Sequence, residues 1–123
     1  MIKCAEIISF MEELAPKTLK EEWDNTGLLV GNRDAAIKRV LVCLDITMAS
    51  IKEALSRKAD LIITHHPVIF NGVKRLDEQD FKGKQLYKLI QNGLCVYVAH
   101  TNLDYADKGV NTCLALALGV RNT

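Results

Sequence analysis

The sequence has few cysteines, no long apolar run and almost no net charge, and each lack argues against a class of protein. Four cysteines are spread over 123 residues without a C-x-x-C pair, so a disulfide framework is not expected. No apolar stretch approaches the roughly 20 residues that a bilayer-spanning helix needs. Sixteen basic and fifteen acidic residues leave a net charge of +1, which gives no sign of binding to nucleic acid or to an anionic membrane.

Several catalytic and targeting motifs are also absent. There is no G-x-x-x-x-G-K-[ST] or G-x-G-x-x-G loop for nucleotide phosphates and no G-x-S-x-G elbow for a serine nucleophile. Glu6, Glu12 and Glu13 interrupt the only apolar region near the N-terminus, so we expect no secretory signal and a cytoplasmic location. We expect the four cysteines to be reduced and to serve as small apolar side chains in the structure; they are Cys4, Cys43, Cys95 and Cys113.

Strand and helix patterns alternate along most of the chain. The run RVLVCLD at 39–45 is typical of a strand covered on both faces, and Thr47 is a candidate helix N-cap. This alternation predicts a single α/β domain over residues 1–123, with a mostly parallel sheet. The expected strands are 28–30, 39–45, 60–66 and 94–99, and the expected helices are 2–15, 47–58, 81–91 and 107–118.

All three histidines follow predicted strands. His65 and His66 come after LIIT, His100 comes after VYVA, and Asp104 lies four residues further on. Because the carboxyl ends of parallel strands share one edge of the sheet, these side chains can converge there. Imidazoles and a carboxylate are the ligands of borderline divalent metals, so the pattern indicates a candidate metal site.

The adjacency of His65 and His66 leaves alternatives open. Neighbouring side chains in a regular strand point to opposite faces, although Pro67 ends the ladder here. The two rings therefore either bind two ions a few ångströms apart, bridged by Asp104, or one binds while the other supports it. In the structural alternative, the histidines bond to backbone carbonyls at the strand ends and Asp104 serves a turn.

The segment WDNTG begins with three further candidates. Trp23 is more typical of a core or interface anchor than of a platform for stacking a ligand. Asp24 and Asn25 are turn-capping residues or, alternatively, polar groups of the site.

Three stretches together resemble a known family. WDNTGLLVG at 23–31, DLIITHHPVIF at 60–70 and VYVAHTNLDYADKGVNTCLA at 96–115 are similar to the N-terminal part of YbgI/YqfO-type dinuclear metal proteins, the GTP cyclohydrolase 1 type 2 homologues. The resemblance implies a three-layer α/β fold with helices on both faces of the sheet. It also implies toroidal homohexamers acting on a small-molecule substrate.

The resemblance further implies roles for the site residues. His65, His66 and Asp104 match metal ligands, and His100 matches a histidine near the metals that contacts a ligand or the substrate. Asp24 and Asn25 are expected beside this site. Two divalent ions are expected, with Zn, Fe, Mn, Co and Ni equally compatible with the ligands.

Length sets this chain apart from the family. Members are about twice as long or longer and complete the site with a histidine and a glutamate from a C-terminal motif, which residues 1–123 do not contain. We therefore expect an N-terminal portion with weakened metal binding. The leading functional hypothesis is a metal-dependent, hydrolase-like protein, and the alternative is a metal-binding oligomeric scaffold without turnover.

Overall fold

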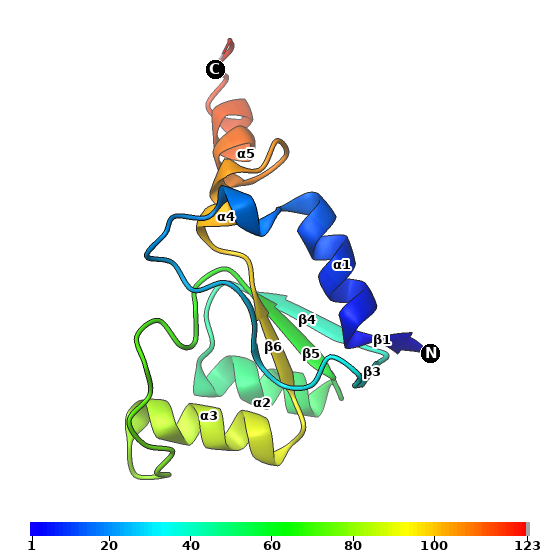
Figure 1. Cartoon of the computed structure of the whole chain (residues 1–123), viewed down its shortest axis with the longest axis vertical. Coiled ribbons are helices and arrows are strands. Elements are labelled where there is room, and N and C mark those ends of the chain that lie inside the picture. Colours follow the sequence, from blue (N-terminus) through cyan, green and yellow to red (C-terminus); the bar gives the residue numbers. More distant parts are fainter. Residues whose placement is uncertain (123) are drawn as a thin grey trace.

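A computed structural model of the chain describes residues 1–122 and contains a central four-stranded sheet in the order β2-β6-β5-β4 (Figure 1). Strands β4 (Val40–Cys43), β5 (Leu61–Thr64) and β6 (Cys95–Val98) run parallel, while β2 (Gly27–Val30) pairs antiparallel with β6. The expected mostly parallel α/β architecture is therefore confirmed.

Helices cover both faces of this sheet. Helix α1 (Cys4–Leu14) lies over one face, and α2 (Met48–Ser56) and α3 (Phe81–Gln91) lie over the other, as Figure 1 shows. This arrangement gives three layers. The remaining elements are β1 (Ile2–Lys3) paired with β3 (Ala36–Ile37), the short 3-10 turn η1 (Lys17–Leu19), α4 (Thr101–Tyr105) and α5 (Val110–Ala117).

The two cores follow from the alternation of side chains along β6. Val96 and Val98 face α2 and α3, where they pack with Ile51 and Leu86. Their neighbours Cys95 and Tyr97 face the other way and pack in a second core against Cys4, Ile8 and Met11 of α1. Because all four residues of β6 are buried, β6 holds both cores together and fixes where its carboxyl end lies.

Two helix boundaries match the sequence analysis closely. Helix α3 covers residues 81–91, as expected, and its N-terminus is capped by Asp80, whose carboxylate accepts a hydrogen bond from the Gly83 amide at 2.8 Å. Thr47 caps α2 in the same way, with its hydroxyl accepting from the Ser50 amide at 3.0 Å.

Strand β4 corrects the expectation of a strand covered on both faces. Val42 is 73% exposed and Leu44 is also exposed. The core beneath α1 takes its sheet residues from β5 and β6, so α1 leaves the neighbouring face of β4 open. A continuous apolar run cannot by itself distinguish an edge strand from a central one.

The last expected helix also begins later than residue 107. Residues 101–105 form α4, and α5 starts at Val110 after a turn at Gly109. A Cβ at Gly109 would lie 1.8 Å from the carbonyl oxygen of Leu103, so glycine permits this close crossing. The helical spacing of apolar residues runs on across 107–109, so it gave no sign of the turn that precedes α5.

Over residues 1–122, the chain forms no helix that is both long enough and apolar enough to cross a membrane.

Candidate metal centre

The three histidines meet at the carboxyl edge of the sheet. His65 and His66 follow β5, and His100 follows the adjacent strand β6. The ring centre of His65 lies 5.2 Å from that of His66 and 5.1 Å from that of His100, and the rings of His66 and His100 are 5.6 Å apart. One ring nitrogen from each histidine falls within 4.8 Å of the other two, so this group can hold a metal ion.

The end of β5 explains how adjacent histidines reach the same site. The strand stops at Thr64, whose hydroxyl donates a hydrogen bond to the carbonyl of His66 at 3.0 Å. This turn breaks the alternation that would send the two rings to opposite faces. The His66 amide still donates to the Leu44 carbonyl, at 3.0 Å, so the turn remains anchored to the end of β4.

Each histidine uses its Nδ1 atom for a contact inside the protein. Nδ1 of His65 lies 2.8 Å from the carbonyl oxygen of Ala99, a bond to backbone that the structural alternative anticipated. Nδ1 of His66 lies 2.6 Å from Oδ1 of Asp45, and Nδ1 of His100 lies 2.9 Å from Oδ1 of Asp24. Carbonyl and carboxylate oxygens accept hydrogen bonds, so Nδ1 is the donor in each contact and Nε2 is the ring nitrogen left to face the site.

Asp104 joins the cluster from α4. Its amide donates to the carbonyl of His100 at 3.1 Å, which places the carboxylate one helical turn beyond that histidine. Oδ1 of Asp104 then lies 3.4 Å from Nε2 of His65. The expected convergence of a distant carboxylate with the histidine pair is therefore present at His65.

Asp24 contacts both its own turn and the histidine cluster, since Oδ1 accepts from the Asn25 amide and lies 2.9 Å from Nδ1 of His100. Burial by itself would raise the pKa of its carboxyl group, but hydrogen bonds from the Thr101 hydroxyl, His100 and the amides of Thr101 and Asn25 outweigh that effect and lower the pKa to about 2. The resulting carboxylate fixes the orientation of His100. Asn25 has a different role, because its side-chain amide donates to the Ile69 carbonyl at 2.7 Å and so anchors the segment after the histidine pair.

Trp23 lies at the rim of the site and not in the core. It is 61% exposed, and its ring centre is 5.9 Å from that of Phe70 and 6.5 Å from that of His100, to whose ring plane it is inclined by 78°. Of the expected core or interface anchor, the core role is wrong, because Trp23 lies on the surface. Its segment is held there by the Glu21 amide, which donates to the Thr101 hydroxyl at 3.0 Å. An exposed aromatic pair therefore borders the histidines.

Asp45 is the site residue that the sequence analysis missed. It lies at the end of the expected strand 39–45, and so at the same sheet edge as the histidines. Its position after a predicted strand is a signal of the same kind as that of the histidines, since β4 and β5 are parallel neighbours whose carboxyl ends meet.

The fold and this edge define an α/β protein with a candidate divalent-metal centre built from imidazoles and carboxylates. Residues 2–123 match the model of the Duf34/NIF3 (NGG1p interacting factor 3) family, and the chain belongs to that family. It is 39% identical, over 118 residues and 96% of its length, to a Clostridium acetobutylicum protein named GTP cyclohydrolase 1 type 2 homolog.

Solved structures agree with this membership. A Bacillus cereus protein related to NIF3 superposes with a TM-score of 0.94 at 42% identity, over 98% of this chain and 33% of the other. The protein ybgI shares the fold, with a TM-score of 0.83 at 24% identity, over 96% of this chain and 47% of the other. This chain spans 44% of the Clostridium acetobutylicum relative and 32% of a Bacillus subtilis relative, less than half of each.

Proposed function

We propose that this chain is a divalent-metal-binding protein with a hydrolase-like site, in which His65, His66 and Asp104 are metal ligands. The observation that carries the proposal is that all three histidines spend Nδ1 on an internal acceptor, which leaves Nε2 for a metal. A structural role in capping strand ends would account for one such bond. It would not account for two buried or half-buried carboxylates, Asp24 and Asp45, each aimed at a different histidine.

The donor set supports borderline divalent ions over Ca²⁺ or Mg²⁺. Neutral imidazole suits Zn, Fe, Co and Ni, and a carboxylate extends the range to Mn. We propose two ions, with the Asp104 carboxylate able to serve both. In that arrangement His100, held by Asp24, would face the substrate, whereas a single ion would be held by all three imidazoles.

Hydrolysis is the reaction class that such a site favours. Bound divalent ions supply Lewis acidity and lower the pKa of a water molecule that they bind. The protein's own part is to hold the imidazoles in a fixed orientation, and Trp23 and Phe70 offer an aromatic rim against which a substrate can pack. The name shared by the curated relatives makes GTP one candidate substrate. We also propose homohexameric assembly for this chain, as the resemblance of its three sequence stretches implies.

Metal binding is tested by equilibrium dialysis of the purified chain against Zn²⁺, Mn²⁺ or Co²⁺, followed by elemental analysis. We expect bound metal in the wild type and in the control variant Asp34→Ala. Asp34 is an exposed carboxylate that pairs with Lys3 and takes no part in the histidine cluster. His65→Ala and Asp104→Ala should lose it while keeping the wild-type circular dichroism, because these side chains add little to either core. Equal metal content in all four proteins would contradict the proposal.

A measurement of turnover distinguishes the proposed hydrolase from the alternative, a metal-binding scaffold without catalytic activity. GTP and simple phosphoesters are incubated with the metal-loaded chain, and its oligomeric state is measured by light scattering. Hydrolysis that disappears in both His65→Ala and Asp104→Ala supports the hydrolase. Metal binding and oligomers without any turnover support the scaffold.

A further inference from the structure

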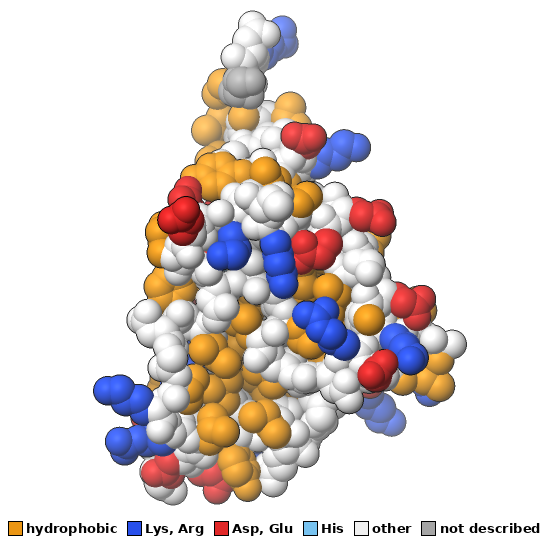
Figure 2. All heavy atoms as spheres, in the orientation of Figure 1, with side chains coloured by type: hydrophobic (Ala, Val, Ile, Leu, Met, Phe, Trp, Pro, Cys, Tyr) orange, Lys and Arg blue, Asp and Glu red, His pale blue; other side chains and the backbone are white. Residues whose placement is uncertain are grey.

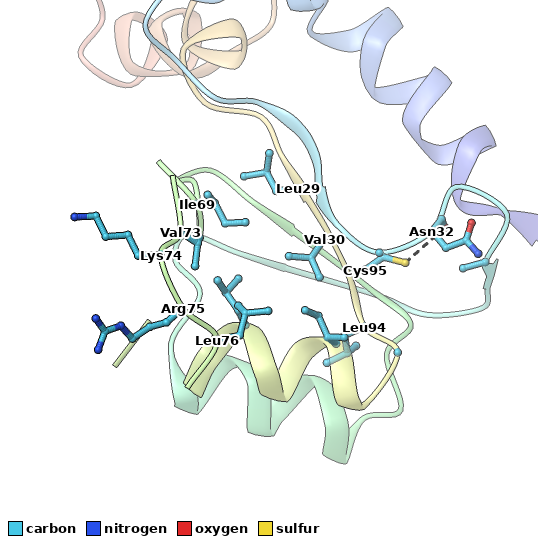
Figure 3. A pocket seen from close by; sticks show the side chains of 15 residues that line it. Leu29, Val30, Asn32, Ile69, Val73, Lys74, Arg75, Leu76, Leu94 and Cys95 are labelled. Atoms are coloured by element: carbon cyan, nitrogen blue, oxygen red, sulfur yellow. Dashed lines mark hydrogen bonds between the residues drawn. The ribbon is translucent and has the colours of Figure 1, made fainter. Parts of the chain in front are cut away.

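A cavity of about 700 Å³ lies away from the histidines, between β2 and α3 (Figure 3). Leu94 and Cys95, at the start of β6, line it, whereas His100 follows the other end of that strand. None of the proposed metal ligands borders this cavity. It is therefore a second feature, independent of the metal centre.

The cavity has an apolar interior. Aliphatic side chains from the strand, the helix and the loop before the helix point into it, as the labelled sticks in Figure 3 show for the strand and loop. No acidic residue is among its lining residues. Its size lies within the range of about 300–1,000 Å³ typical of small-molecule sites. The aliphatic lining consists mainly of Leu29, Val30, Leu76, Leu86, Ile90 and Leu94.

Two cations stand at the mouth. Lys74 and Arg75 belong to the lining, and in Figure 3 their charged ends extend away from the apolar side chains. Within residues 1–122, neither side chain has an ion pair or a hydrogen bond to a protein group. Such a mouth is positively charged without internal compensation.

An adjoining cavity of about 500 Å³ extends this positive region. Lys74 and Arg75 line it together with Lys82 and Asp80. The Asp80 carboxylate is engaged as the cap of α3, accepting from the Gly83 amide at 2.8 Å. Three cations against one occupied carboxylate favour an anionic group at the junction of the two cavities.

We propose that this cavity binds a small anionic amphiphile, with the alkyl chain among the leucines and the carboxylate head beside Lys74 and Arg75. Burial of the ligand's alkyl chain supplies the non-directional attraction. The guanidinium and ammonium groups favour a head group of negative charge. A ligand of this class fits both the aliphatic lining and the uncompensated charge. A neutral or cationic amphiphile fits only the lining.

The test measures the binding of dodecanoate, kept below its micellar concentration, by isothermal titration calorimetry. The protein is kept metal-free by a chelator. Dodecyltrimethylammonium, with the same chain and the opposite charge, is the matched ligand. We expect saturable binding of dodecanoate at one site per chain and at least tenfold weaker binding of the cation. His66→Ala should bind dodecanoate as the wild type does, which separates this proposal from the metal site.

Variants at exposed lining positions keep the fold and probe each half of the site. Ile90 is 56% exposed, and Ile90→Gln should weaken dodecanoate binding about tenfold, because an amide then faces the alkyl chain. Lys74→Gln combined with Arg75→Gln should weaken it about five- to tenfold. The matched controls outside the cavity are Lys38→Gln and Leu116→Gln, the latter at a position that is 73% exposed.

Three results would overturn the proposal. The first is equal affinity for the anionic and cationic amphiphiles, and the second is unchanged binding in Ile90→Gln. The third is self-association of the chain that excludes dodecanoate, which would make a second copy the occupant.

Discussion

Oδ1 of Asp45 lies 2.6 Å from Nδ1 of His66, across the ends of two adjacent parallel strands. Both side chains are about half exposed, so the contact adds little to either core. Its effect is on His66 itself. The carboxylate keeps the proton on Nδ1, fixes the ring and makes Nε2 a better electron donor.

Removal of the Asp45 carboxylate should therefore weaken metal binding without unfolding the protein. We expect Asp45→Ala to lower the affinity for Zn²⁺ by about 10- to 100-fold. Asp45→Asn keeps an acceptor oxygen and loses only the charge, so its effect should be smaller. Competition with a chromophoric chelator measures both, with Asp34→Asn as the control, and wild-type affinity in Asp45→Ala would contradict an orienting role.

Trp23 provides an intrinsic reporter of the metal centre. It is the only tryptophan, and its ring centre lies 6.5 Å from that of His100. Co²⁺ bound among the histidines should quench the emission excited at 295 nm, whereas Zn²⁺, which has a filled d shell, should not. Titration in His65→Ala supplies the control: quenching that persists there would place the ion elsewhere.

The cysteines should differ sharply in reactivity. Cys4 and Cys95 are buried in the core beneath α1, and burial, reinforced by Cys95, raises the pKa of the Cys4 thiol to about 11. Burial also raises the pKa of Cys43, while Cys113 is exposed. At pH 8 we expect Ellman's reagent to modify Cys113 first, Cys43 more slowly, and the other two only after denaturation. Loss of the fast phase in Cys113→Ser verifies the assignment, and rapid modification of four thiols in native protein would contradict it.

Tyr97 should make the protein less stable at alkaline pH. Its hydroxyl donates to the Glu12 carboxylate at 3.1 Å, and burial together with the charge of Glu12 raises the pKa of the phenol well above its usual 10.0. Because the folded state holds this proton more tightly, its contribution is complete below pH 10 and is lost as the pH rises further.

Urea denaturation between pH 8 and pH 11 measures this effect. Tyr97→Phe should cost about 1 kcal/mol at pH 8 and then show a shallower loss of stability than the wild type, by up to about 1.4 kcal/mol per pH unit. Tyr87→Phe, which changes a partly exposed tyrosine on α3, should follow the wild-type curve. Parallel curves for Tyr97→Phe and the wild type would show that this phenol does not titrate with unfolding.

Local signals carried the prediction of most elements. The helical spacing over residues 81–91 coincides with α3, and the Thr47 cap is present because a side-chain oxygen at that position satisfies an amide within its own turn. The open face of β4 and the break at Gly109 were beyond such signals. Each depends on what packs against the element, namely the reach of α1 in one case and the carbonyl of Leu103 in the other.

The sequence by itself determined the alternation of strands and helices, and with it the placing of His65, His66, His100 and Asp104 at one edge of the sheet. Periodicity and strand ends are properties of neighbouring residues, so they can be read along the chain. Only the tertiary structure decided that Asp24 and Asp45 orient two of those rings and that Trp23 borders them. These contacts join residues that are 21 to 77 positions apart in the sequence. Such residues meet only when the cores on both faces of the sheet have formed.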